Sequence, residues 1–308
     1  MRVVYSPRYH IDIGSHVFPT IKYQLLHREL TTRGGYTFVE PAPLSWEDLA
    51  LVHTAEYLEK VRTGDFTFAE IAQIEMPWAP AIVEGFRLMS GGTLLAARHA
   101  LEPDDTSQIT HHKSHMGLGL HIGGGFHHAF ANHGEGFCLF NDVAVSIRRL
   151  QREQSITRAA IIDCDVHHGN GTAMIFDQDP TVFTFSIHQQ HNYPAFKPRG
   201  SLDIGVDDRM QNVEYLTKLR QALPRVLAFD PEIVFYLAGA DPYEDDQLGG
   251  LALTVEGLHE RDRLVFSACH AANVPVVLTL AGGYARRIEE TVSIHRRTFE
   301  AAREVFSM

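Results

Sequence analysis

The chain has 308 residues, 44 % of them hydrophobic, so it is long enough to bury a large core. The formal net charge is −11 and no block of Lys or Arg occurs, which argues against a nucleic-acid-binding surface. No run approaches the roughly 20 apolar residues that span a bilayer, and three scattered cysteines exclude a disulfide framework or a CxxC zinc site. With no signal-peptide pattern, we expect a cytoplasmic protein that binds neither nucleic acid nor membranes.

Short apolar runs recur along the chain and leave room for helices between them. Several are followed by glycine or by a polar cluster. Seven of them predict strands, at residues 3–5, 37–39, 118–121, 159–162, 182–186, 233–237 and 276–280.

Helical periodicity is clearest in the segments between these runs. Asn141 or Asp142 could cap the second predicted helix, and Pro224 is expected to interrupt the third. Residues 188–205 are long and aperiodic, and are expected to form a functional or mobile loop. The predicted helices are 80–100, 141–151, 213–228, 255–272 and 286–305.

Alternating strands and helices predict the fold class. We expect an α/β protein whose mostly parallel sheet carries helices on both faces. The sequence shows no repeat, low-complexity tract or linker, so residues 1–308 are expected to form a single domain.

The richest polar cluster, residues 163–171, directly follows the predicted strand 159–162. Open α/β sheets build their sites at the carboxyl ends of strands. Alternation sends Asp163, Asp165 and His167 to one side, where carboxylate and imidazole could hold a divalent cation. The alternative is a polar loop that caps the next helix with Asn170.

Residues 123–128, after the predicted strand 118–121, combine three glycines with His127 and His128. Adjacent imidazoles on such a loop could share acid–base work; two exposed side chains on a turn are the alternative. Further along, Phe137 after Gly136 is either one wall of an apolar slot or a packed turn residue.

Two more strands end in the same kind of cluster. Asp241 follows strand 233–237 and could supply a third ligand, which would leave an open position and suit catalytic zinc or Fe(II); a helix cap or Asx turn is the alternative. Tyr284, presented by two glycines, could aim its hydroxyl into the same cavity or be a core residue opening the last helix.

Taken together and in this order, the motifs resemble those of the histone deacetylase family, which has the arginase–deacetylase fold. The similarity is greatest to class IV and bacterial histone deacetylase-like enzymes. The matching motifs are residues 123–129, 136–138, 163–171, 238–241, 248–251 and 281–284.

This resemblance implies a zinc-dependent deacylase that hydrolyses an ε-acyl-lysine-type amide. Its implied zinc ligands are Asp165, His167 and Asp241, with Fe²⁺ as a possible substitute. The resemblance also implies that His127 and His128 are catalytic, that Asp163 accepts a hydrogen bond from His127, and that Asn170 orients His128. It implies that Tyr284 donates to the substrate carbonyl and that Gly136, Phe137 and Tyr193 line the substrate channel. A structural potassium site is implied at Asp163, Asp165, His167 and Ser186.

Some departures from the family pattern bear on the substrate. No acidic residue clearly matches the one that class I enzymes use at the channel rim, and Cys164 replaces a larger apolar residue. The partner is therefore either an acylated lysine peptide or a small acylated amine such as an acetylpolyamine. A non-catalytic acyl-lysine-binding module is a further alternative, whereas an arginase-type dimanganese site would need more carboxylates.

Overall fold

Eight parallel strands form one sheet in the computed structural model, which describes residues 1–102 and 117–307. The strand order is β2-β1-β3-β8-β7-β4-β5-β6. The strands are β1 (Arg2–Val4), β2 (Thr37–Val39), β3 (Leu118–His121), β4 (Ala159–Asp163), β5 (Val182–Gln189), β6 (Leu202–Val206), β7 (Ile233–Leu237) and β8 (Val276–Thr279).

Burial follows position in the sheet. Every residue of β4, β7 and β8 is buried, as expected for central parallel strands covered on both faces. The outermost strands β2 and β6 are partly exposed. The apolar runs therefore identify the centre of the sheet, where the candidate site lies.

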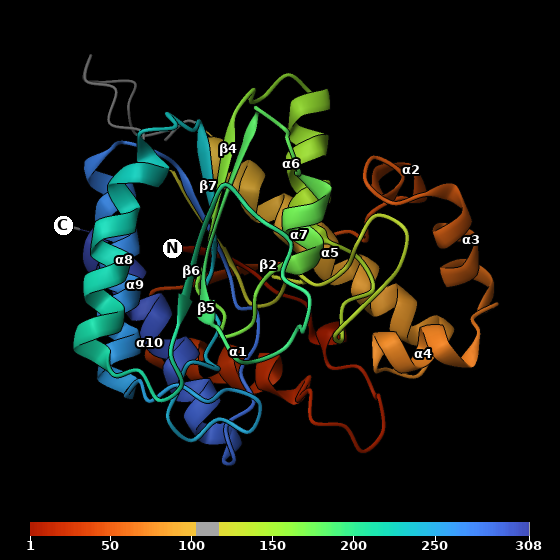
Figure 1. Cartoon of the computed structure of the whole chain (residues 1–308), viewed down its shortest axis with the longest axis horizontal. Coiled ribbons are helices and arrows are strands. Elements are labelled where there is room, and N and C mark those ends of the chain that lie inside the picture. The colour runs from red at the N-terminus through yellow and green to blue at the C-terminus, as the bar shows by residue number, and fades with distance from the viewer. Residues whose placement is uncertain (103–116, 308) are drawn as a thin grey trace.

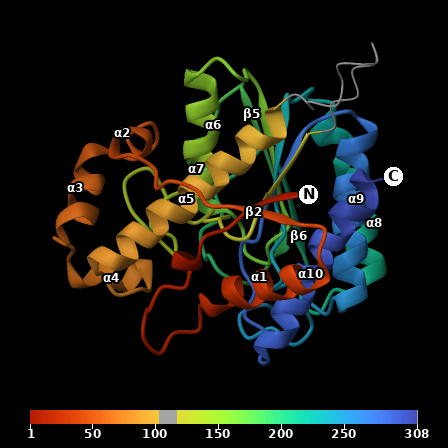
Figure 2. The same cartoon turned by 180° about the vertical axis from the view of Figure 1, so that it is seen from behind.

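Helices cover the two faces of the sheet (Figures 1 and 2). On one face α9 packs between α8 and α10, with α1 against α10; on the other, α5 packs on α6 and β3. The helices are α1 (Ile21–Arg33), α2 (Trp46–Leu49), α3 (Ala55–Thr63), α4 (Phe68–Ile74), α5 (Pro80–Leu101), α6 (Asp142–Arg152), α7 (Asn170–Ile175), α8 (Asn212–Leu227), α9 (Val255–Ala271) and α10 (Ile288–Phe306), besides the 3₁₀ helix Pro7–Tyr9.

The predicted fold class is confirmed, but the segment 188–205 is not one long loop. β5 continues to Gln189, and β6 begins at Leu202 and pairs in parallel with β5. β6 was missed because it is a short edge strand in which Asp203 and Gly205 separate the apolar residues. Only the residues between these strands form the loop.

The five predicted helices are present, and the side chain of Asn141 caps α6 by accepting from the Ala144 N–H at 3.0 Å. The expected interruption at Pro224 is wrong, because α8 continues through it to Leu227. This proline lies in the last turn, so it removes one hydrogen bond close to where the helix ends. The shorter helices α2, α3, α4 and α7 and the weakly amphipathic α1 were not predicted.

Within residues 1–102 and 117–307, no helix is both long enough and apolar enough to cross a bilayer.

Candidate active site

The loops after four neighbouring strands bring the predicted site residues together. β3, β8, β7 and β4 lie next to one another and run in the same direction. Their carboxyl ends therefore meet at one edge, where open α/β sheets place their sites. The loop after β3 carries His127 and His128, and the loop after β8 carries Tyr284. The loop after β7 carries Asp241, and the loop after β4 carries Asp165 and His167.

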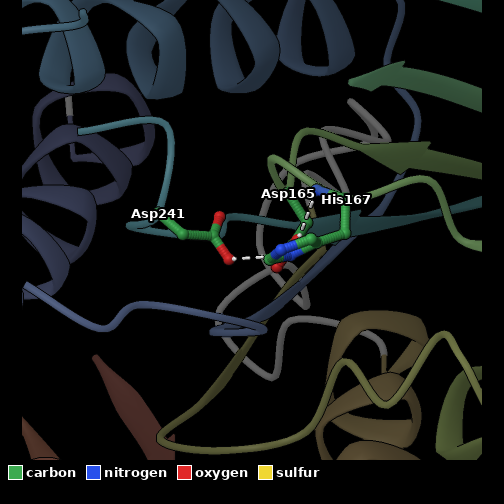
Figure 3. A group of neighbouring side chains, drawn as sticks. All are labelled: Asp165, His167 and Asp241. Atoms are coloured by element: carbon green, nitrogen blue, oxygen red, sulfur yellow. Dashed lines mark hydrogen bonds and ion pairs between the residues drawn. The ribbon is translucent and has the colours of Figure 1, made fainter. Parts of the chain in front are cut away.

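Asp165, His167 and Asp241 form a buried group at this edge (Figure 3). Each offers one ligand atom, and the three atoms all lie within 4.8 Å of one another. Nδ1 of His167 is 3.0 Å from Oδ1 of Asp165 and 3.5 Å from Oδ2 of Asp241. Two carboxylates and one imidazole thus converge from two separate loops.

This group fits a divalent cation. Oδ2 of Asp241 is buried and makes no hydrogen bond with the described residues. Burial, and then the neighbouring Asp165 carboxylate, raise the pKa of the Asp241 carboxyl. The backbone N–H groups of Val166 and Gly282 donate to the other oxygens, Oδ1 of Asp241 at 2.9 Å and Oδ2 of Asp165 at 2.8 Å. A cation would satisfy the remaining oxygen and balance two buried carboxylates.

The two adjacent histidines contact each other beside this group. Their Nε2 atoms are 3.1 Å apart, and both rings are buried. Nδ1 of His127 lies 2.7 Å from Oδ2 of Asp163, and Nδ1 of His128 lies 2.7 Å from Oδ1 of Asn170. Each imidazole therefore has its own polar partner, a carboxylate for one and an amide for the other.

These partners give the imidazoles different charges. Burial alone would lower the pKa of His127, but the Asp163 and Asp165 carboxylates overcome it and raise that pKa to about 9. Burial, and then the charge of His127, lower the pKa of His128 well below its ordinary value. These shifts favour a cationic His127 beside a neutral His128.

A pocket of about 180 Å³ opens onto these groups. The ring of Phe137 packs edge-on against Tyr284 with centroids 5.9 Å apart, and Tyr193 packs edge-on against His128 at 5.0 Å. Burial, followed by nearby carboxylates, raises the pKa of Tyr284 well above its ordinary value, so its hydroxyl keeps a proton to donate. The pocket thus combines aromatic walls with imidazoles, carboxylates and a phenol.

Two glycines permit the close packing of this site. Gly136 has a φ of +50°, and a Cβ there would lie 2.8 Å from Cδ2 of His128. A Cβ on Gly282 would lie 1.9 Å from Oδ2 of Asp241 and 2.7 Å from Oδ2 of Asp165. Side chains at either position would displace the site residues.

Two carboxylates near the pocket were not predicted. Glu75 lines the pocket just after α4, in a segment with no recognisable motif. Glu135 lies between Gly134 and Gly136 and accepts from Nδ2 of Asn170 at 2.5 Å. A glutamate inside a glycine-rich motif is the signal that could have identified the second of these residues.

Three further unpredicted residues brace the loops. Lys22 is wholly buried and donates from Nζ to the Ala281 carbonyl at 2.9 Å, and Asp246 accepts from the Tyr284 N–H at 2.7 Å. Arg261 is also wholly buried and reaches two of the strand-end loops from α9. No sequence pattern marks these residues, because their partners are distant in the chain.

The predicted potassium residues lie around the end of β4. Asp163 pairs with Ser186 in the register of β4 and β5, and the Ser186 hydroxyl is 2.9 Å from Nδ1 of His188. The side chains of Asp165 and His167 face Asp241 instead. A potassium ion would therefore have to use backbone oxygens of this loop, and that site stays a prediction.

The fold and the pocket together define an α/β enzyme with a polar site at the carboxyl edge of its sheet. The chain belongs to the histone deacetylase family: the model of the Histone deacetylase domain matches residues 16–298. The predicted resemblance is thereby confirmed, and with it the assignment of the protein as a hydrolase.

Several relatives match most of the chain. An uncharacterized protein of Picosynechococcus sp. is 39% identical over 99% of both chains. Histone deacetylase 2 of Arabidopsis thaliana is 32% identical over 92% of this chain and 74% of its own, and the acetoin utilization protein AcuC of Bacillus subtilis is 30% identical over 87% and 73%.

Solved structures show the same fold at low identity. The HDA15 HD domain superposes with a TM-score of 0.79 at 21% identity, covering 98% of this chain and 90% of that one. The acetylpolyamine aminohydrolase from Burkholderia pseudomallei superposes with a TM-score of 0.77 at 19% identity over 99% of both chains.

Proposed function

We propose that this protein is a zinc-dependent deacylase that hydrolyses an ε-acyl-lysine-type amide to a free amine and a carboxylate. The observation that carries the proposal is the convergence of Asp165, His167 and Asp241 within 4.8 Å beside the imidazole pair. Asp165, His167 and Asp241 would hold the ion, which supplies Lewis-acid polarisation of the amide carbonyl. Iron(II) fits the same donors.

The other site residues would move protons. His128 is neutral because burial and then the charge of His127 lower its pKa, so it can take a proton from the attacking water. The Tyr284 hydroxyl donates to the carbonyl oxygen as negative charge develops there. A protonated imidazole then supplies the proton that the departing amine needs. Asp163 and Asn170 orient the two rings through their Nδ1 atoms.

The walls of the pocket favour a slender apolar chain next to the reacting amide. Phe137, Tyr193 and Leu248 all contribute to its lining, and Phe137 also stacks on Phe18 with centroids 6.1 Å apart. These side chains would pack along the methylene groups of an acylated lysine, with Gly136 allowing the close approach of the wall to His128.

A small acylated polycation such as an acetylpolyamine is the second candidate substrate. Glu75 adds a carboxyl to the pocket lining, where it would face a cationic nitrogen beyond the acylated one. A peptide that carries acyl-lysine need not have a second, cationic nitrogen at that position. Selectivity between the two substrate types therefore tests the role of Glu75.

We also propose that residues 1–308 form one catalytic domain in a reducing compartment such as the cytoplasm. The first and last strands of the chain, β1 and β8, are both neighbours of β3 in the same sheet, which supports one domain. Cys138, Cys164 and Cys269 are buried and unpaired, which supports a reducing compartment.

The deciding experiment is a hydrolysis screen with the zinc-loaded protein. Acyl-lysine peptides from acetyl to myristoyl and a set of acetylpolyamines would be tested before and after chelation, with zinc added back. We expect turnover of at least one class, its loss on chelation and its return with zinc. A protein that holds one zinc per chain and hydrolyses none of these amides would contradict the proposal and favour an acyl-lysine-binding module.

A further inference from the structure

Glu135 occupies a fixed position behind the imidazole pair. Its backbone forms two hydrogen bonds with Cys138, at 3.1 and 2.9 Å, which close a tight turn around it. Its side chain is only 13% exposed. Oε1 accepts from Nδ2 of Asn170, and Oε2 accepts from Nε2 of Gln73 at 3.0 Å and lies 3.4 Å from Nε2 of His133.

These contacts keep Glu135 ionised. Burial alone would raise the pKa of its carboxyl, but hydrogen bonds from His133, Asn170 and other side chains lower that pKa to about 2. An ionised carboxylate only accepts hydrogen bonds. The group that Asn170 turns towards Glu135 must therefore be its NH₂.

The orientation of the Asn170 amide then decides which nitrogen of His128 carries the proton. With NH₂ towards Glu135, the amide oxygen faces Nδ1 of His128 at 2.7 Å. An amide oxygen also only accepts, so Nδ1 must be protonated and Nε2 must hold the lone pair. The reversed amide would present a donor to Nδ1 and favour a proton on Nε2.

We propose that Glu135 is a positioning residue that orients Asn170 and thereby keeps the basic lone pair of His128 on Nε2. This inference rests on the proposed role of His128 as the general base. Asn170 alone could satisfy either tautomer, because its amide offers both a donor and an acceptor; the carboxylate removes that choice.

The test removes the carboxylate that can only accept. Glu135→Gln retains the shape, but its amide can donate as well as accept, so it no longer holds the Asn170 amide in one orientation. We expect kcat on the best acylated substrate to fall about 10- to 100-fold with KM nearly unchanged. In Glu135→Gln/Asn170→Asp the new carboxylate accepts from both neighbours, so most of the lost kcat should return. Glu56→Gln, which removes a charge from a side chain that is 85% exposed, is the matched control.

The outcomes separate this inference from the proposed function. Unchanged kcat in Glu135→Gln, or a double variant no faster than the single one, would overturn the positioning role. Nitrogen NMR of ¹⁵N-histidine-labelled, zinc-loaded protein reads the His128 tautomer without turnover. If the wild type hydrolyses nothing, the proposed function fails. Loss of the Nδ1–H tautomer of His128 in Glu135→Gln would still support the positioning role of Glu135. Retention of that tautomer in Glu135→Gln would refute the role.

Discussion

At the residue scale, the identity of the group behind each imidazole sets its charge. Asp163 is a carboxylate 2.7 Å from His127, and it stabilises a cation there. Asn170 is a neutral amide at the same distance from His128, so burial and then the charge of His127 keep that ring uncharged. Two neighbouring histidines of identical chemistry thus obtain one acidic and one basic member.

Tyr284 tests the stabilisation of the carbonyl oxygen. Tyr284→Phe removes only the hydroxyl, so we expect kcat to fall by about 100-fold or more, the loss typical of an oxyanion donor. Zinc content and the midpoint of thermal unfolding should stay as in the wild type, because the ring still packs on Phe137. Steady-state kinetics and metal analysis of the purified variant measure both; normal turnover would exclude the role.

Asp241 tests the metal group. Asp241→Asn keeps the size of the side chain but removes a negative charge from the three-ligand group. We expect zinc affinity to fall by at least tenfold, because a neutral amide replaces one of the two carboxylates in the group of three donors. Competition with a chelating dye measures the affinity. A zinc affinity equal to that of the wild type would show that this carboxylate is not a ligand.

At the scale of elements, the strand-end turns decide where these side chains point. The turn after β8 places the Gly282 N–H on Asp165, and the loop after β4 places the Val166 N–H on Asp241. Each turn thus orients a carboxylate that belongs to another loop. Asp246 adds a third connection by accepting from the backbone of both Tyr284 and Leu248.

Gly282 is the most sensitive position of these turns. In Gly282→Ala the new methyl group would lie 1.9 Å from Oδ2 of Asp241, far inside contact distance. We expect loss of zinc binding and of activity in a protein that still folds. Circular dichroism and metal analysis would measure these two properties. Gly14→Ala, at a glycine with a φ of +73° and nothing near its Cβ, strains the backbone of another loop without a steric clash and should bind zinc normally.

At the scale of the whole molecule, α9 packs between α8 and α10 on one side of the sheet (Figure 1). It contacts the central strand β7, because Asp262 accepts from the Tyr236 hydroxyl and Phe266 packs edge-on against the same ring. Arg261 on this helix donates from Nη1 to the carbonyls of Gly239 at 2.6 Å and Cys164 at 3.3 Å. It also pairs with buried Asp262 at 2.8 Å. One guanidinium therefore connects the loops that carry Asp241 and Asp165 to the helical layer.

Removing this guanidinium should destabilise the entire fold. Arg261→Met leaves the Asp262 carboxylate buried without its cation, which we expect to cost about 3–5 kcal/mol of unfolding free energy. Chemical denaturation monitored by fluorescence measures the change. The neighbouring Arg263 is 49% exposed, and Arg263→Met should change stability by less than about 1 kcal/mol. Equal losses in both variants would contradict the bracing role.

The sequence by itself determined the α/β class, seven of the eight strands and the polar clusters after four of them that meet at the site. It could do so because buried parallel strands are apolar runs, and the polar groups directly after them must meet at one edge of the sheet. This local rule, together with the family resemblance, predicted Asp165, His167 and Asp241 as one group.

Only the tertiary structure decided which side chains support that site. Lys22 meets the Ala281 carbonyl across 259 residues of chain, and Arg261 meets Cys164 across 97. Glu135 reaches Asn170 only because the turn after β3 and the start of α7 pack together. Such contacts leave no periodic trace in the sequence, because they depend on how distant segments pack and not on the local pattern around each residue.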